Sequence, residues 1–172
     1  AFAAEQPVAT PTSPNDKPGI ALIGCGGMGS GDLRGASKFG NVVAVCDVDE
    51  GRAANVAKPY AQDGKTPAVF SDFRKMLERP DVHIIINGTP DHWHSLVNIA
   101  AARAKKDTYG EKPLTLTIDE GKQVIKAIRN NKTVFQTGTQ QRSDRRFRLA
   151  CELVRNGRIG KLKEVNVWVP AG

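Results

Sequence analysis

Residues 20–29 read Ile-Ala-Leu-Ile-Gly-Cys-Gly-Gly-Met-Gly, a short apolar run that passes directly into a glycine-rich turn. The spacing G-x-G-x-x-G is weak evidence alone and becomes specific when a strand precedes it and a helix follows it. Gly24 then allows a tight turn, Gly26 lets the backbone approach a pyrophosphate, and Gly29 lets the helix pack closely on the strand. Unpaired N–H groups at the helix start favour phosphate. The stretch predicts a dinucleotide-binding turn rather than a glycine turn without a ligand, with contacts from Gly24, Gly26, Gly27, Met28 and Gly29.

From Gly19 onward, short β-branched runs alternate with amphipathic stretches, which is typical of βαβ units and a parallel sheet. The fifth helix is expected to begin with a capping box formed by Thr117 and Glu120. The predicted strands cover residues 20–23, 42–46, 68–70, 82–86, 107–110 and 133–137, and the predicted helices cover 29–39, 50–60, 72–78, 92–105 and 118–130. Six strands suit the doubly wound order, so the chain is predicted to be an α/β protein with a Rossmann sheet.

Both ends of the chain depart from this alternation. Residues 1–18 contain four prolines among small polar residues and predict an extended arm. Residues 19–142 form the predicted dinucleotide-binding domain. Residues 143–172 are predicted to begin a second α+β domain that is largely missing from the chain. They offer one helix, from apolar residues at i, i+3, i+4 and i+7, and one two-faced strand, from alternating valines: Phe147, Ala150, Cys151 and Val154, then Val165, Val167 and Val169.

The net charge of +7 is unevenly distributed, because residues 1–102 sum to −2 and residues 103–172 to +9. Nucleic-acid binding is one explanation, but the basic residues are not interleaved with aromatic residues and have no zinc-finger or basic-zipper spacing. A solvated basic face that steers an anionic cofactor is the preferred interpretation. We therefore expect no nucleic-acid partner. No apolar run approaches the ~20 residues of a membrane helix, so we expect no membrane partner either.

The three cysteines, Cys25, Cys46 and Cys151, are widely spaced and suggest neither a disulfide framework nor a zinc site. They are expected to be small buried residues. The start Ala1-Phe2-Ala3 resembles the end of an export signal, although the preceding regions that would define one are absent. A periplasmic or exported location and a cytoplasmic one both stay open.

Asp47 ends the second predicted strand about 18 residues after Gly29, close to the ~20-residue offset of an acidic residue that accepts the adenosine ribose hydroxyls. A carboxylate there repels a 2′-phosphate, which favours NAD over NADP. NADP stays possible because Arg52 could neutralise the phosphate. The alternative for Asp47 is a helix N-cap, although Asp49 is better placed for that role.

Two further strands run into polar segments, Thr89-Pro90-Asp91-His92-Trp93-His94 and Glu111-Lys112-Pro113. In a parallel sheet all carboxyl ends share one edge. These segments should therefore meet the glycine turn and Asp47 where the strand order reverses, which is where open α/β sheets bind ligands.

With these four features the chain resembles the glucose-fructose oxidoreductase and inositol dehydrogenase family of sugar and polyol oxidoreductases, from about Gly19 to its end. The resemblance implies a catalytic lysine at Lys112, which faces substrate and cofactor. It also implies that several residues line the cofactor pocket, namely Thr89, Pro90 and His94 near the nicotinamide, with Gln141 and Arg142 contacting the nicotinamide or its ribose. Glu111 is grouped with them, either orienting Lys112 or lying on the surface as an acid. Lys106 and Thr108 depart from the family pattern and should alter packing rather than chemistry.

The implied reaction is hydride transfer between a sugar or polyol carbon and nicotinamide, with Lys112 handling the hydroxyl proton. A relative that cleaves glycosides by transient oxidation, a non-catalytic dinucleotide-binding module and a basic nucleic-acid-binding protein are the alternatives. His92 and His94 would point about 200° apart on one helix and lack a third ligand, so no metal is expected. The full-length enzyme is expected to be a homo-oligomer, and the isolated chain is expected to be inactive.

Overall fold

The computed structural model describes residues 17–62 and 64–168. Contacts divide the chain into two compact units, of which the first ends at Gly138 and the second begins at Thr139. The predicted arm over residues 1–18 lies outside the described residues except for Lys17 and Pro18, and so does the Ala-Phe-Ala start. No helix of the described chain has the length and apolar character that crossing a membrane requires.

The first unit contains a six-stranded sheet in the order β3-β2-β1-β4-β5-β6, and every neighbouring pair is parallel. This order confirms the predicted doubly wound Rossmann sheet, whose direction of winding reverses between β1 and β4. The strands are β1 (Gly19–Ile23), β2 (Asn41–Cys46), β3 (Ala68–Phe70), β4 (Ile84–Asn87), β5 (Asp107–Glu111) and β6 (Phe135–Gly138).

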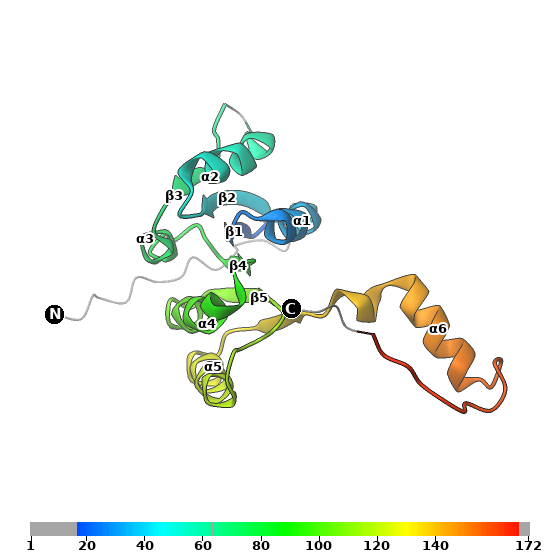
Figure 1. Ribbon diagram of the computed structural model, residues 1–172. Coiled ribbons are helices and arrows are strands. Elements are labelled where there is room, and N and C mark those ends of the chain that lie inside the picture. Colours follow the sequence, from blue (N-terminus) through cyan, green and yellow to red (C-terminus); the bar gives the residue numbers. More distant parts are fainter. Residues whose placement is uncertain (1–16, 63, 169–172) are drawn as a thin grey trace. The chain divides into compact units, whose positions relative to one another are not determined.

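Helices cover both faces of this sheet (Figure 1). They are α1 (Gly27–Ala36), α2 (Glu50–Ala57), α3 (Phe73–Leu77), α4 (His94–Arg103) and α5 (Ile118–Asn131), with short 3₁₀ turns η1 (Lys58–Tyr60) and η2 (Asp91–Trp93). The predicted capping box is present, because Thr117 accepts from the Glu120 N–H and Glu120 reaches back to the Thr117 N–H. The helix predicted over 92–105 is instead divided, since residues 91–93 form a 3₁₀ turn after Pro90 before α4 begins.

Alternate residues of β1 belong to two different cores. Ile20 and Leu22 pack in one cluster with Leu33 of α1 and with two alanines of α2. Ala21 and Ile23 pack in the other cluster with residues of α3 and α4. Both faces of the strand are therefore buried, as a parallel sheet between two helical layers requires.

The second unit contains η3 (Gln140–Ser143) and α6 (Arg145–Arg155), and Gly157 ends the helical segment with φ +67°. The helix predicted after the sheet is confirmed. The strand predicted over 165–169 is wrong at residues 165–168, which form no regular structure, and Val169 lies outside the described residues. Within the described part of this unit no strand is present to complete a ladder, and an unpaired strand leaves its backbone groups unsatisfied.

The cysteine prediction is correct in part. Cys25 and Cys46 are buried, whereas Cys151 on α6 is exposed. Its helical spacing places it on an apolar stripe, but no residue of α6 is buried in the described structure. The spacing of apolar residues therefore predicted which residues share one face of the helix, but it could not predict whether that face is buried.

Candidate functional site

The glycine turn joins β1 to α1 through very short backbone contacts. Gly24 has φ +88°, a conformation that other residues rarely adopt. A Cβ on Gly29 would lie 2.2 Å from the Gly24 carbonyl oxygen, and a Cβ on Gly88 would lie 2.5 Å from the Gly29 Cα. The three glycines thus bring β1, α1 and the end of β4 together, and the close packing predicted for Gly29 is confirmed.

The start of α1 is suited to a phosphate. Gly26 is its N-cap, no side chain caps it, and its first turn contains no acidic residue. A Cβ on Gly26 or Gly27 would meet no atom within 4 Å, so open space lies beside the turn. The helix therefore presents unpaired N–H groups and the positive end of its dipole to that space. Met28, in the same turn, is exposed.

Asp47 lies directly beside this turn, at the end of β2. Its carboxylate accepts hydrogen bonds from the Cys25 N–H at 2.8 Å and from the Asp49 N–H at 3.0 Å. Asp49, and not Asp47, is the N-cap of α2, because Asp49 accepts from the Arg52 N–H at 3.0 Å. Asp47 therefore holds the glycine turn and keeps further lone pairs for hydroxyl donors.

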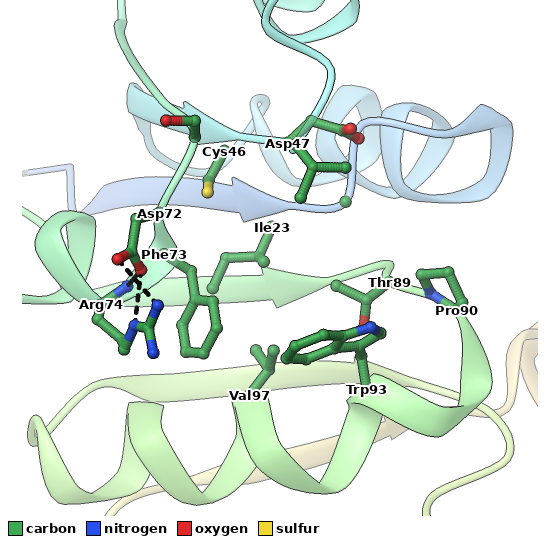
Figure 2. A pocket seen from close by; sticks show the side chains of 13 residues that line it. Ile23, Cys46, Asp47, Asp72, Phe73, Arg74, Thr89, Pro90, Trp93 and Val97 are labelled. Carbon is green, nitrogen blue, oxygen red and sulfur yellow. Dashed lines mark hydrogen bonds and ion pairs between the residues drawn. The ribbon is translucent and has the colours of Figure 1, made fainter.

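A cavity of about 280 Å³ opens next to Asp47 at the carboxyl ends of β1, β2, β3 and β4. Figure 2 shows Asp47 and Cys46 on one side of it, Trp93 and Val97 on the opposite side, and Phe73 with Arg74 at one end. Phe73 and Trp93 meet edge to face with their ring centroids 6.4 Å apart. Thr89 and Pro90 complete the lining. The cavity thus has a carboxylate on one wall and aromatic rings on another.

Two arginines near this cavity already have carboxylate partners. Arg74 donates to both oxygens of Asp72, at 2.9 and 3.0 Å, and these hydrogen bonds hold the pKa of Asp72 below its usual value. Arg52 lies 3.9 Å from Asp49. The β3–α3 segment that contributes Asp72 to Arg74 was not among the predicted site residues. The rule that strand ends share an edge could have identified it, since it follows β3.

The end of β5 brings Glu111 and Lys112 to the same edge of the sheet. Lys112 is exposed, and its peptide bond to Pro113 is cis. Glu111 is buried at 3% exposure, with its carboxylate packed so closely on Gly138 that a Cβ there would collide with it. The alternative that Glu111 is a surface acid is therefore wrong, because the end of β6 covers it.

His94 is also buried and contacts the backbone of two turns. Its Nδ1 lies 2.5 Å from the Pro113 carbonyl oxygen and its Nε2 lies 2.8 Å from the Thr89 carbonyl oxygen. His92 is exposed in η2. Among the described residues no group of three histidine, cysteine or acidic side chains could hold a metal ion.

The two residues that depart from the family pattern are both buried. The Lys106 ammonium donates to the Arg79 carbonyl oxygen at 2.9 Å, and burial lowers the pKa of Lys106. Lys106 precedes β5, whereas Glu111 ends it, so the lysine lies at the opposite edge of the sheet from the site. Gln141 and Arg142 belong to η3 in the second unit, and their contacts with a cofactor stay a prediction.

The two buried cysteines predict how stability depends on pH. Burial, together with nearby carboxylates, raises the pKa of Cys25 and of Cys46 to about 12 from an ordinary 9.0. Between about pH 9 and 12 the folded chain then binds more protons than the unfolded chain, so the free energy of unfolding should fall as the pH rises. The limit is about 1.4 kcal/mol per pH unit for each thiol. Urea unfolding between pH 8 and 10.5 measures this slope.

The double variant Cys25→Ala, Cys46→Ala should have a flatter profile over the same range. Cys151→Ala is the matched control, because that thiol is exposed and its removal leaves both buried thiols in place. If the free energy of unfolding of Cys151→Ala depended on pH as weakly as that of the double variant, the buried thiols would not be the cause of the pH dependence.

Comparison with known proteins extends these observations. Residues 19–139 match a family model described as "Oxidoreductase family, NAD-binding Rossmann fold". An inositol 2-dehydrogenase of Salmonella paratyphi B is 31% identical over 144 residues, which are 81% of this chain and 42% of that protein. The uncharacterized oxidoreductase YrbE of Bacillus subtilis is 29% identical over 141 residues, 81% of this chain and 40% of that protein.

Among solved structures, myo-inositol 2-dehydrogenase from Lactobacillus plantarum superposes with a TM-score of 0.74 at 27% identity. The match covers 84% of this chain and 43% of the other. The chain thus spans about two fifths of the length of the curated relatives it matches.

Proposed function

Since residues 19–139 carry this match, the chain belongs to the oxidoreductase family with an NAD-binding Rossmann fold, and we propose that it is the NAD-binding half of a dehydrogenase that oxidises a hydroxyl of a sugar or polyol. The observation that carries the proposal is the convergence, at one edge of the sheet, of the uncapped start of α1 with Asp47 and Lys112. Relatives named inositol 2-dehydrogenase support a polyol as the substrate class.

The described residues fit NAD in three places. The N–H groups at the start of α1 would hold the pyrophosphate, because no side chain caps that helix. Asp47 would accept the hydroxyls of the adenosine ribose. The cavity beside Asp47 would take the adenine against Phe73 and Trp93, since its lining combines these apolar rings with polar side chains.

When bound, NAD supplies the acceptor for a hydride. Lys112 moves the proton of the substrate hydroxyl, as an exposed amine at the end of β5 that solvent and substrate can both reach. Glu111 is the buried residue before it and fixes the end of the strand from which Lys112 projects. Thr89 and Pro90 line the cavity beside Asp47, and contacts of Gln141 and Arg142 with the cofactor stay a prediction.

The 172-residue chain alone is proposed to bind NAD without turnover. Residues 143–172 are proposed to begin a second domain, which would supply the wall that orients a polyol over Lys112. Without such a wall the exposed Lys112 amine meets water, and the substrate loses the orientation on which proton and hydride transfer depend. Homo-oligomer formation by the complete enzyme and its location stay predictions.

Asp47 predicts a preference for NADH over NADPH. A 2′-phosphate would face the Asp47 carboxylate, while Arg52 and Arg74 are each paired with another carboxylate. We expect NADPH to bind the chain roughly tenfold to a hundredfold more weakly than NADH, from charge repulsion of about 1.4 to 2.7 kcal/mol. Fluorescence titration with each reduced cofactor gives the two dissociation constants.

Asp47→Asn should bring the dissociation constants of NADPH and NADH closer together, because it removes the charge and keeps one side-chain oxygen to accept a hydrogen bond from the glycine turn. Asp81→Asn makes the same change at the opposite edge of the sheet, beside Arg79, and should leave the ratio unchanged. Equal affinities of the unmodified chain for NADH and NADPH would remove Asp47 from the assigned role.

A further inference from the structure

The β4–α4 turn and the turn after β5 leave the sheet side by side without a shared ladder. The last residue pair between β4 and β5 is Asn87 with Gly110. Beyond it, one chain continues into Thr89-Pro90 and the other into Lys112-Pro113. Both segments belong to the proposed NAD and substrate site. Their spacing therefore depends on contacts other than backbone pairing.

The buried imidazole of His94 provides such a contact. Its Nε2 lies 2.8 Å from the Thr89 carbonyl oxygen and its Nδ1 lies 2.5 Å from the Pro113 carbonyl oxygen. Carbonyl oxygens only accept hydrogen bonds, so each hydrogen bond in this link needs a proton on the ring nitrogen. The neutral ring donates to one of the two carbonyl groups and packs against the other, and the doubly protonated ring donates to both. At 1% exposure, His94 cannot be replaced in it by water without opening the structure.

Asn87 fixes the backbone of His94 and the side chain of Thr89. Its amide nitrogen donates to the His94 carbonyl oxygen at 3.3 Å and to Asn98 Oδ1 at 2.8 Å. Its amide oxygen accepts from the Thr89 hydroxyl at 2.7 Å. The start of α4 and the Thr89 turn are thereby fixed to the end of β4, and the imidazole extends this fixed group to Pro113.

We propose that His94 is a positioning residue that ties the Thr89-Pro90 turn to the Lys112-Pro113 turn and so sets the spacing between the NAD pocket and the catalytic lysine. The proposal rests on the proposed function, because it assigns those turns to the NAD and substrate site. It also changes the role that the family resemblance implies for His94. The ring acts from within the protein through two carbonyl groups, with no free nitrogen to offer a ligand.

Three substitutions separate the two halves of this link. His94→Phe keeps a ring of similar size and removes both nitrogens. A glutamine can place its amide near the Nε2 position, and an asparagine can place its amide near Nδ1. His94→Gln therefore keeps a donor for Thr89, and His94→Asn keeps a donor for Pro113.

NADH titration of the 172-residue chain and its variants is the test. His94→Phe should raise the NADH dissociation constant roughly tenfold, as expected when a buried carbonyl oxygen loses its partner. His94→Gln should restore more of the affinity than His94→Asn, because Thr89 belongs to the turn nearest the cofactor. Val82→Ala is the matched control, since Val82 is fully buried just before β4, at the amino end of that strand. It should lower the melting temperature without changing NADH affinity by more than twofold.

The outcomes distinguish this proposal from the proposed function. An unmodified chain that fails to bind NADH would contradict the proposed function. An NADH dissociation constant of His94→Phe within twofold of that of the unmodified chain would overturn the role of His94. The role would also be overturned if Val82→Ala had the same melting temperature as His94→Phe and lost as much NADH affinity.

A measurement on the unmodified chain covers the case in which the variants do not fold. In long-range ¹H–¹⁵N spectra, a ring N–H of His94 should exchange slowly with solvent, whereas the exposed ring of His92 should exchange rapidly. Equal, rapid exchange at both rings would contradict the hydrogen-bonded link and overturn the proposal.

Discussion

Replacing Lys112 by alanine in a complete enzyme that carries this domain is expected to lower kcat by roughly 10²–10⁴. That range follows from removing a group that moves a proton in the transition state. Cofactor affinity should change little, because the pyrophosphate is proposed to bind the backbone at the start of α1 and the ribose to bind Asp47. Steady-state kinetics with saturating polyol and NAD measures kcat and KM separately.

Lys122→Ala is the matched control for this experiment. Lys122 is an exposed lysine on α5 that is neither in the cavity lining nor among the proposed binding residues, so its loss makes the same change in net charge without removing a site residue. It should leave kcat unchanged. An effect of Lys112→Ala confined to KM would show that the lysine binds substrate without taking part in proton transfer.

The second large effect is expected at Gly29. In Gly29→Ala the new methyl group would lie 2.2 Å from the Gly24 carbonyl oxygen and 3.3 Å from the Gly88 Cα. Both neighbours are backbone, so the turn or the end of β4 must move to relieve the overlap. We expect a loss of roughly 1–3 kcal/mol of stability, as in overpacked cores, together with loss of measurable NADH binding. Urea unfolding and NADH titration of the same sample measure the two effects.

Gly31→Ala, two residues further along α1, is the matched control. A Cβ at Gly31 meets no atom within 4 Å, and alanine favours a helix over glycine by about 1 kcal/mol. This variant should therefore be as stable as the unmodified chain or more so, and it should bind NADH. Normal NADH binding by Gly29→Ala would contradict the packing role given to that glycine.

The sheet could be predicted from sequence because its signals are local. The central strands β1, β2 and β4 are short apolar runs. Both faces of β1 are buried, so a continuous apolar run was enough to identify it. The requirement for glycine at position 29 was equally readable, because the G-x-G-x-x-G spacing specifies a close helix–strand contact. The doubly wound order was predicted from six strands that alternate with helices.

The remaining features depend on contacts between distant segments. The burial of Glu111 is produced by Gly138, which lies on the neighbouring strand. The environment of His94 is set by the Pro113 carbonyl group, 19 residues away. A strand at residues 165–168 would need a partner strand, and alternation of valines with polar residues cannot indicate whether one is present. In each case the sequence identified the residue and the fold determined its role.

We propose above that this chain by itself binds NAD at the edge formed by the glycine turn and Asp47. The most direct test of this proposal is NADH titration of the 172-residue chain at 50 and 200 mM salt, followed by an assay for NADH production with a panel of polyols and NAD. We expect saturable NADH binding at one site, little change in affinity between the two salt concentrations, and no turnover. Binding to DNA that falls steeply with salt, without saturable NADH binding, would contradict the proposal.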